Sequence, residues 1–190
     1  MSRRVDYYDD PDAPTATRIV PSVNVVVTND VGEVLLIRRS DNDNWAVPGG
    51  AVDLGESVAQ AALRETKEES GIDCQITGLV GIYSDPKHVI LYTSDGEVRQ
   101  EFSILLTAHA IGGHPTPSSE SSDVRWVLPS ELSEYGMDRS MRKRVDHYLE
   151  RLDGLKESFK GHCSRCAFEP WALKGRPRRS FLPAIARRAR

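Results

Sequence analysis

The sequence predicts a protein of the α/β or α+β class. Two apolar segments, SVNVVVT (residues 22–28) and EVLLIRR (residues 33–39), have the β-branched composition of strands. An alanine-containing segment without glycine or proline then spans residues 57–70 and predicts a helix of about four turns. Further strand patterns follow this helix, so a sheet covered by helices accounts for the order of elements.

The first two strands are joined by Asn29–Gly32, which carries the Asn, Asp and Gly expected of a hairpin turn. The next segment ends in Pro48-Gly49-Gly50. Pro48 prevents a central strand from continuing, and the two glycines let the backbone approach a phosphate or a metal with no Cβ in the way. A short strand near residues 51–53 then leads into the helix.

The helix at residues 57–70 has a defined beginning and end. Ser57 is a favourable N-cap residue, and Gly71 is expected to terminate the helix. At about 100° per residue, one face would pack on a sheet. That face carries Ala59, Ala62, Leu63 and Thr66. A neighbouring arc carries Glu65, Glu68 and Glu69, so three carboxylates point to one place.

Residues 74–84 and 98–110 predict the later strands, separated by a strand-and-turn segment at residues 85–97. The segment VRWVLPSEL predicts a short strand and a helical turn that Pro129 opens. A closing amphipathic helix is predicted at residues 137–152. Its apolar side carries Met141, Val145, Tyr148, Leu149 and Leu152.

The composition is that of a soluble protein with one sizeable core: of 190 residues, 39% are hydrophobic and 28% are charged. No run approaches the roughly 20 apolar residues that cross a bilayer, so no membrane partner is expected. The first residues lack the apolar stretch of a secretory signal. Cys74, Cys163 and Cys166 form no disulfide framework, which favours a cytoplasmic location.

Charge divides the chain into segments. Residues 1–153 carry 15 Lys and Arg against 26 Asp and Glu, whereas residues 154–190 carry 10 against 2. We therefore expect a flexible N-terminal arm at 1–17, a compact domain at 18–153 and a basic, disordered tail at 154–190. His162, Cys163 and Cys166 in the tail form half of a zinc site, and no second pair completes four ligands.

The three helical carboxylates suit a divalent cation. Like charges four residues apart destabilise an isolated helix by about 0.2–0.5 kcal/mol per pair, a cost that a bound cation would reverse. Hard oxygen ligands of this kind suit Mg²⁺ or Mn²⁺. Taken alone, the same residues also fit a solvated acidic face.

The residues around this helix follow one fixed set of spacings. From Gly50 to Ile72 the chain reads G-AVDLG-E-SVAQAAL-RETKEE-S-G-I. This pattern resembles the Nudix box of the Nudix (MutT-type) hydrolases. Its strictly specified positions are filled by Gly50, Glu56, Arg64, Glu65, Glu68, Glu69 and Gly71. The resemblance covers roughly residues 18–152 and implies the Nudix fold, a mixed β-sheet in an α/β/α sandwich.

The resemblance also implies an activity. Nudix hydrolases use divalent cations, here Mg²⁺ or Mn²⁺, to cleave the phosphoric anhydride of a nucleoside diphosphate linked to a further group X. The implied partner is a small nucleotide rather than a nucleic acid: a sugar nucleotide such as ADP-ribose, a dinucleotide, or a nucleoside triphosphate, including oxidised forms. Homodimers are frequent among such proteins, and the sequence leaves the oligomeric state open.

Site roles follow from the resemblance. The metal ligands are expected to be Glu65, Glu68, Glu69 and Gly50. Glu56 and Arg64 would support the loop and orient the helix, although Arg64 also fits a surface ion pair. Members of the family differ in the general base, so Glu68 is the first candidate and Glu120, in a polar loop before a strand, is the second.

Other residues have less specific patterns. The backbone of Gly49 and Gly50 is assigned to the substrate site, and at least one of Arg38 and Arg39 could reach substrate phosphates as a bidentate donor. Glu101 is a candidate additional metal ligand. A loop with Tyr83, Asp85 and His88, together with Arg99, could lie over the nucleotide.

An alternative function is a non-catalytic Nudix-type module that senses nucleotides or contacts nucleic acid through the basic tail. The intact acidic residues of the box favour the enzyme. The sequence does not specify X.

Overall fold

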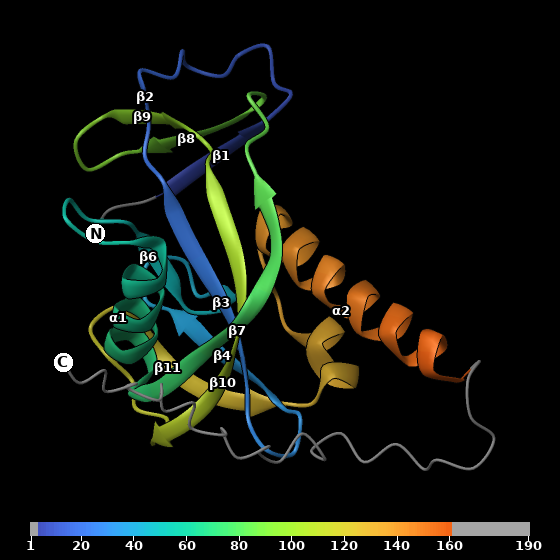
Figure 1. Cartoon of the computed structure of the whole chain (residues 1–190). Coiled ribbons are helices and arrows are strands. Elements are labelled where there is room, and N and C mark those ends of the chain that lie inside the picture. The colour runs from blue at the N-terminus through green and yellow to red at the C-terminus, as the bar shows by residue number, and fades with distance from the viewer. Residues whose placement is uncertain (1–3, 161–190) are drawn as a thin grey trace, which may run out of the picture.

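A computed structural model of the chain describes residues 4–160, with side chains described up to residue 153. It shows an α/β architecture in which a mixed sheet lies between two helices, α1 and α2 (Figure 1). The elements, in chain order, are β1 (Arg4–Tyr8), β2 (Arg18–Ile19), β3 (Ser22–Thr28), β4 (Val34–Arg39), β5 (Trp45–Ala46), β6 (Gly49–Ala51), α1 (Val58–Ser70), β7 (Ile72–Tyr83), β8 (His88–Tyr92), β9 (Glu97–Gln100), β10 (Ser103–Gly113), β11 (Ser121–Val127), the 3-10 helix η1 (Pro129–Glu134) and α2 (Arg139–Lys160).

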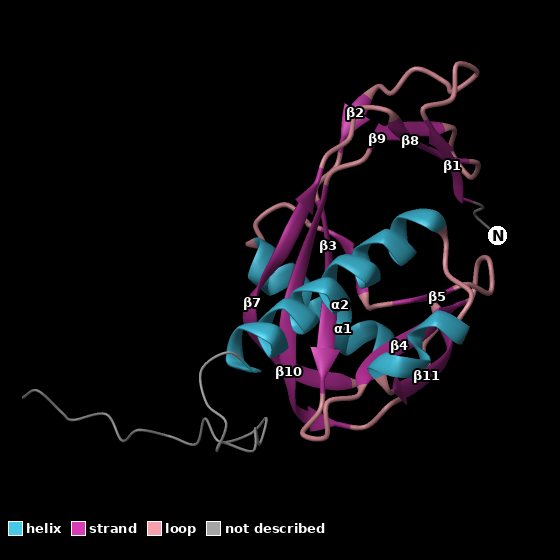
Figure 2. Ribbon diagram, turned by 90° about the vertical axis from the view of Figure 1, so that its right-hand side faces the viewer, coloured by secondary structure: helices cyan, strands magenta, loops and turns pink. Residues whose placement is uncertain are grey.

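The central sheet has the strand order β11-β4-β3-β10-β7, with β5 paired to β4 and β6 paired to β3. Strand β10 is parallel to β3 and antiparallel to β7, so the sheet is mixed. The consecutive residues Val25, Val26 and Val27 on β3 are at most 1% exposed, and because their side chains point alternately to the two faces, β3 is covered on both. Figure 1 shows α1 and α2 on opposite sides of this sheet, which confirms the predicted α/β/α sandwich, and in Figure 2, turned by 90°, the two helices overlap.

Helix α1 begins and ends where the sequence predicts. The Ser57 hydroxyl accepts a hydrogen bond from the Gln60 N–H at 3.3 Å, while the Gln60 side chain accepts one from the Ser57 N–H at 2.8 Å. Gly71 ends the helix in the left-handed region, with φ of 74°, and its N–H donates to the Lys67 carbonyl. The helix ends are therefore fixed by local contacts.

The buried face of α1 differs from the predicted one. The predicted face holds two buried residues, Ala62 and Thr66, and two exposed ones, Ala59 and Leu63. The observed face also includes Ala61 and Glu69. It is rotated toward Glu69 because that side chain turns inward to accept a hydrogen bond from the Gly49 N–H at 2.7 Å.

A second, smaller sheet stands at one end of the molecule, in the order β1-β8-β9-β2 (Figure 1). The prediction of a flexible arm was wrong for Arg4–Tyr8. These residues form β1, which pairs antiparallel with β8 from Arg4 opposite Tyr92 to Tyr8 opposite His88. No local feature of the sequence indicates this pairing, because the partner strand lies far along the chain.

The single strand predicted at residues 98–110 is two strands that belong to different sheets. Strand β9 ends at Gln100 in the smaller sheet, and β10 begins at Ser103 in the central one. Between them the Glu101 N–H donates to the His88 carbonyl at 3.0 Å, and the Phe102 carbonyl accepts from the Ser22 N–H at 2.9 Å. Each of these residues is thus bonded to the sheet next to it.

Helix α2 is longer than the predicted closing helix. It starts after Asp138, whose side chain accepts the Met141 N–H at 2.8 Å, and Met141, Val145 and Tyr148 are buried as predicted. The helix continues to Lys160 and so extends into the segment that the sequence assigned to the tail. The rest of the tail, with His162, Cys163 and Cys166, lies outside the described residues. Within residues 4–160, no helix has the length and apolar character needed to cross a membrane.

The helix end at Gly71 can be tested against a matched glycine. An alanine Cβ at Gly71 would lie 2.7 Å from the His114 carbonyl oxygen, whereas one at Gly96, with a similar φ of 73°, would meet nothing within 4 Å. Backbone strain alone costs about 1–2 kcal/mol. In urea denaturation we expect Gly96→Ala to lose about that much stability and Gly71→Ala to lose clearly more. Equal losses would show that the 114–116 loop does not press on the helix end.

Candidate functional site

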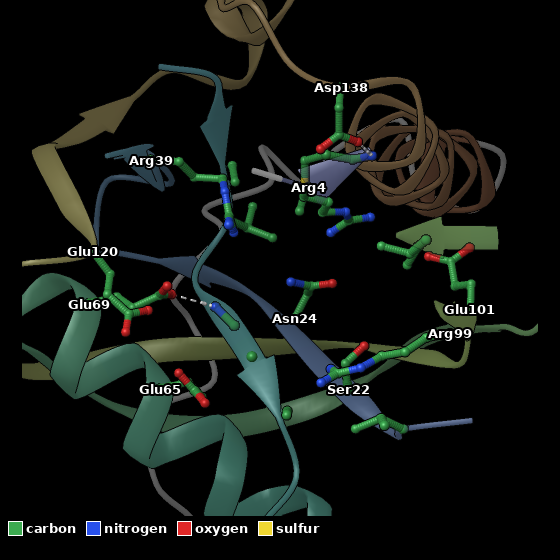
Figure 3. Close-up of a pocket in the computed structure, with 18 of the residues that line it drawn as sticks. Arg4, Ser22, Asn24, Arg39, Glu65, Glu69, Arg99, Glu101, Glu120 and Asp138 are labelled. Carbon is green, nitrogen blue, oxygen red and sulfur yellow. Dashed lines mark hydrogen bonds between the residues drawn. The ribbon is translucent and has the colours of Figure 1, made fainter. Parts of the chain in front are cut away.

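A cavity of about 490 Å³ lies between α1, the central sheet and the smaller sheet. Its volume is within the range of roughly 300–1,000 Å³ that ligand sites occupy. Figure 3 shows Glu65, Glu69 and Glu120 on one side, the guanidinium groups of Arg4 and Arg99 on the other, and Arg39 between them. We call the first side the acidic wall, made of Glu65, Glu68, Glu69 and Glu120. The second is the outer-sheet wall, which includes Arg4, Tyr92 and Arg99.

Glu69 is the most buried carboxylate of the acidic wall, with 5% of the residue exposed. Burial, together with the neighbouring Glu65 and Glu120 carboxylates, raises its pKa to about 8. The hydrogen bond from the Gly49 N–H and the charge of Arg39 lower the pKa of Glu69, but they do not outweigh the effect of burial and the neighbouring carboxylates. A cation at this wall would therefore stabilise the ionised form.

The glycine turn fits closely against α1. A Cβ on Gly50 would lie 2.5 Å from Cδ of Glu65, and one on Gly49 would lie 2.7 Å from the Asn24 Cα. Only glycine leaves room for the Glu65 carboxyl beside the backbone here. The structure thus brings the predicted Gly49, Gly50 and Glu65 together in one place.

Arg64 is the centre of the contacts around the box. It donates to both carboxyl oxygens of Glu56, at 2.7 and 3.0 Å, and to the Ala51 carbonyl at 3.2 Å. Its Nη1 also donates to Glu65 at 2.9 Å and to Glu68 at 3.0 Å. Arg64 therefore ties the loop before α1 to the helix, and it neutralises part of the carboxylate charge.

The donor set at the acidic wall fits a hard divalent cation. The carboxylates are oxygen ligands, they share one cavity, and the buried Glu69 has the Gly49 N–H as its hydrogen-bond donor. Within the residues whose side chains are described, however, no group of three or more His, Cys, Asp or Glu side chains is arranged to hold a metal ion. Arg64 engages two of the three helical carboxylates, so binding a cation requires those contacts to change.

The two neighbouring arginines have different positions. Arg39 lines the cavity and is held by Asp41 through two hydrogen bonds of 2.9 and 2.7 Å. Arg38 is not among the residues that line it; its side chain is 44% exposed and pairs with Asp43 at 3.4 Å. Side chains alternate along β4, so only one of two consecutive arginines faces the cavity.

The two further carboxylates also differ. Glu120 lines the cavity beside Glu69 (Figure 3). Glu101 also lines it, but both of its oxygens are engaged, one by His88 and one by Arg144. Glu101 is therefore committed to a buried ion network, which does not favour its predicted role as an additional metal ligand.

Of the loop residues considered, Arg99 lines the cavity, whereas His88 is 3% exposed and lies in the same buried network as Glu101. Tyr83 instead bonds and stacks with His147 on α2. Arg4 was not predicted at all. Its only sequence signal is the Arg4-x-Asp6 spacing, which has a meaning only once β1 is known to be a strand.

Comparisons with known proteins find similar sequences and a similar fold. A family model described as the NUDIX domain matches residues 18–150. A MutT-like protein of Streptomyces ambofaciens is 33% identical over 141 residues, covering 74% of this chain and 82% of its own length. An ADP-ribose pyrophosphatase of Methanocaldococcus jannaschii is 28% identical, covering 70% of this chain and 75% of its own length. The crystal structure of a MutT protein from Methanosarcina mazei Go1 has a TM-score of 0.54 at 23% identity, covering 76% of this chain and 99% of its own.

The role of Arg64 can be tested on the free energy of unfolding. Arg64→Ala removes five hydrogen bonds and leaves Glu56, Glu65 and Glu68 without their shared cation, so we expect a loss on the order of 1–2 kcal/mol. Lys67→Ala on the same helix is the control. Its pair with Asp73 is half exposed, and such pairs contribute roughly 0–1 kcal/mol. A loss at Arg64 no larger than that at Lys67 would contradict this role.

Proposed function

This chain belongs to the NUDIX domain family, and on that premise we propose that it hydrolyses the P–O–P anhydride of a nucleoside diphosphate linked to a further group X. One observation carries the proposal: the box helix sets Glu65, Glu68 and Glu69 on the wall of a ligand-sized cavity, against the Gly49–Gly50 turn. The named activity of the Methanocaldococcus jannaschii relative is of this class.

The proposed cofactor is Mg²⁺ or Mn²⁺, held by Glu65, Glu68 and Glu69 with help from the Gly50 backbone. A bound divalent cation would neutralise phosphate charge and lower the pKa of the attacking water. The side chains alone cannot do this, since three carboxylates repel the phosphates that must enter. Glu56 and Arg64 are positioning residues: their hydrogen bonds hold the loop and helix in register.

A general base must take a proton from the attacking water. Glu68 is the first choice, because its side chain is 60% exposed and faces the cavity without being enclosed by it. Glu120 is the second, because it lines the same wall from a different loop. Arg39, which lines the same cavity, would supply guanidinium donors to phosphate oxygens.

Candidate substrates include ADP-ribose, other sugar nucleotides, and nucleoside triphosphates in normal or oxidised form. The alternative of a nucleic-acid-binding module depends on the basic tail. Most of that tail lies outside the described residues, so the structure adds no observation in its favour.

Removal of the metal tests the chemistry. The purified protein is assayed against the nucleotide panel with Mg²⁺, with Mn²⁺, and with excess EDTA. We expect turnover with at least one cation, loss of turnover in EDTA, and recovery when the cation is restored. Full turnover in EDTA would rule out the metal mechanism.

Two glutamine variants test the base. We expect the correct base to lose at least about a hundredfold in kcat, because general-base catalysis contributes on the order of 10²–10⁴. Glu68→Gln and Glu120→Gln are compared with Glu150→Gln, the same change at an exposed position on α2 that lines no described cavity. Metal affinity, measured separately by titration with Mn²⁺, distinguishes a lost ligand from a lost base. Wild-type kcat in both test variants would exclude both candidates.

A further inference from the structure

The outer-sheet wall of the cavity is built in part by residues outside the 18–150 match. Arg4 lies on β1, lines the cavity, and has only 18% of its side chain exposed. Arg99 reaches the same wall from β9, and Tyr92 from β8. Each of these three strands belongs to the smaller sheet. Arg4 therefore reaches this wall only because β1 docks on β8.

Both arginines of this wall are held in the same way. Arg4 donates to Asp6 through Nε at 2.8 Å and Nη2 at 2.7 Å. Arg99 donates to Glu97 through Nε at 2.7 Å and also through Nη2. In each case the carboxylate lies two residues away on the same strand. A guanidinium has five N–H donors, of which these contacts use the ones on Nε and Nη2, and Figure 3 shows both groups pointing into the cavity.

A chain of buried charges fixes Arg4 in this position. Asp6 also bonds to Nε2 of His88 at 2.6 Å, His88 bonds to Glu101 through Nδ1, and Glu101 bonds to Arg144 on α2. His88, Glu101 and Arg144 are each less than 8% exposed. Burial raises the pKa of Asp6, but the hydrogen bonds from His88 and Arg4 outweigh it and lower the pKa to about 2. The clamp on Arg4 is thus ionised at neutral pH.

One further acidic residue, Asp138, lies near Arg4, and its charge helps to raise the pKa of that guanidinium. Asp138 lines the cavity, but its Oδ1 accepts from the Met141 N–H at 2.8 Å and from the Ser140 hydroxyl at 2.8 Å. It therefore serves as the cap of α2, where the positive end of the helix dipole stabilises its charge. The guanidinium N–H groups remain the donors that the wall offers.

We infer that the outer-sheet wall, through Arg4 and Arg99, binds a second anionic group of the substrate, a phosphate-type oxyanion remote from the box carboxylates. This rests on the proposed function and narrows the substrate to nucleotides whose negative charge spans the cavity. Arg4 is the specificity-determining residue, because it comes from a strand outside the matched domain. Pre-positioned guanidinium groups bind such oxyanions through charge-assisted hydrogen bonds at little entropic cost.

The test uses inorganic pyrophosphate as the probe and omits the metal. Binding to the full chain is measured by calorimetry in EDTA at about 0.15 M salt, where the Debye length of about 8 Å screens weak contacts with exposed basic residues. Arg4→Gln should weaken binding roughly tenfold, the effect expected from losing one charge-assisted contact. Arg99→Gln should weaken it to a similar extent.

Arg125→Gln is the matched control. Arg125 also pairs with a carboxylate two residues away, Asp123 at 2.5 Å, but it does not line the cavity. The affinity of the Arg125→Gln protein for pyrophosphate should therefore stay within twofold of wild type. Each variant is checked by thermal melting, and binding is measured well below its transition. If Arg4→Gln does not fold, Arg99→Gln alone decides the test.

The outcome separates this inference from the proposed function. If the protein hydrolyses nucleotides, Arg4→Gln should raise KM by about tenfold while kcat changes less, since the lost contact is remote from the reacting phosphates. If pyrophosphate binding depends on the two arginines but no nucleotide is hydrolysed, anion binding by the outer-sheet wall is supported and only the proposed hydrolase activity is overturned. Equal pyrophosphate affinity in wild type, Arg99→Gln and Arg4→Gln would overturn the inference, whatever the activity.

Discussion

The cavity depends on the close approach of helix α1 to the Gly49–Gly50 turn. The Gly49 N–H donates to the buried Glu69 carboxylate, and the missing Cβ of Gly50 leaves space for Glu65. On its apolar side the helix buries Ala61 and Ala62 in the core. Hydrophobic packing and polar contacts therefore fix the same helix position, and a side chain at Gly50 would displace the Glu65 carboxyl from its place beside the turn.

This approach creates an electrostatic problem, because carboxylates are crowded at one wall of a partly enclosed cavity. Arg64 reduces the repulsion by bonding to Glu65 and Glu68, but it does not reach Glu69, whose pKa is raised. Guanidinium groups lie on the opposite wall. A cavity with carboxylates on one wall and guanidinium donors on the other suits a ligand that brings both a cation and phosphates, which is the chemistry of a metal–nucleotide complex.

The smaller sheet is the part of the fold that departs most from expectation. An acidic, proline-containing segment near a terminus resembles a loose arm by composition, yet Arg4–Tyr8 pair with β8. The reason is a set of long-range contacts, since Asp6 completes its charge network only with His88 and Arg4. Composition reflects the intrinsic structural preference of a segment. A strand that is stabilised mainly by pairing with a distant strand therefore has no recognisable signal in its own composition.

The sequence by itself determined the local parts of the site. Helix periodicity places Glu65, Glu68 and Glu69 on neighbouring positions, and the Ser57 cap and Gly71 set the ends of the helix, because these effects act within a few residues. Only the tertiary structure decided which face of α1 is buried, that Arg39 rather than Arg38 lines the cavity, and that Arg4 reaches it. Those outcomes depend on the register and docking of strands far apart in the chain, which no local pattern encodes.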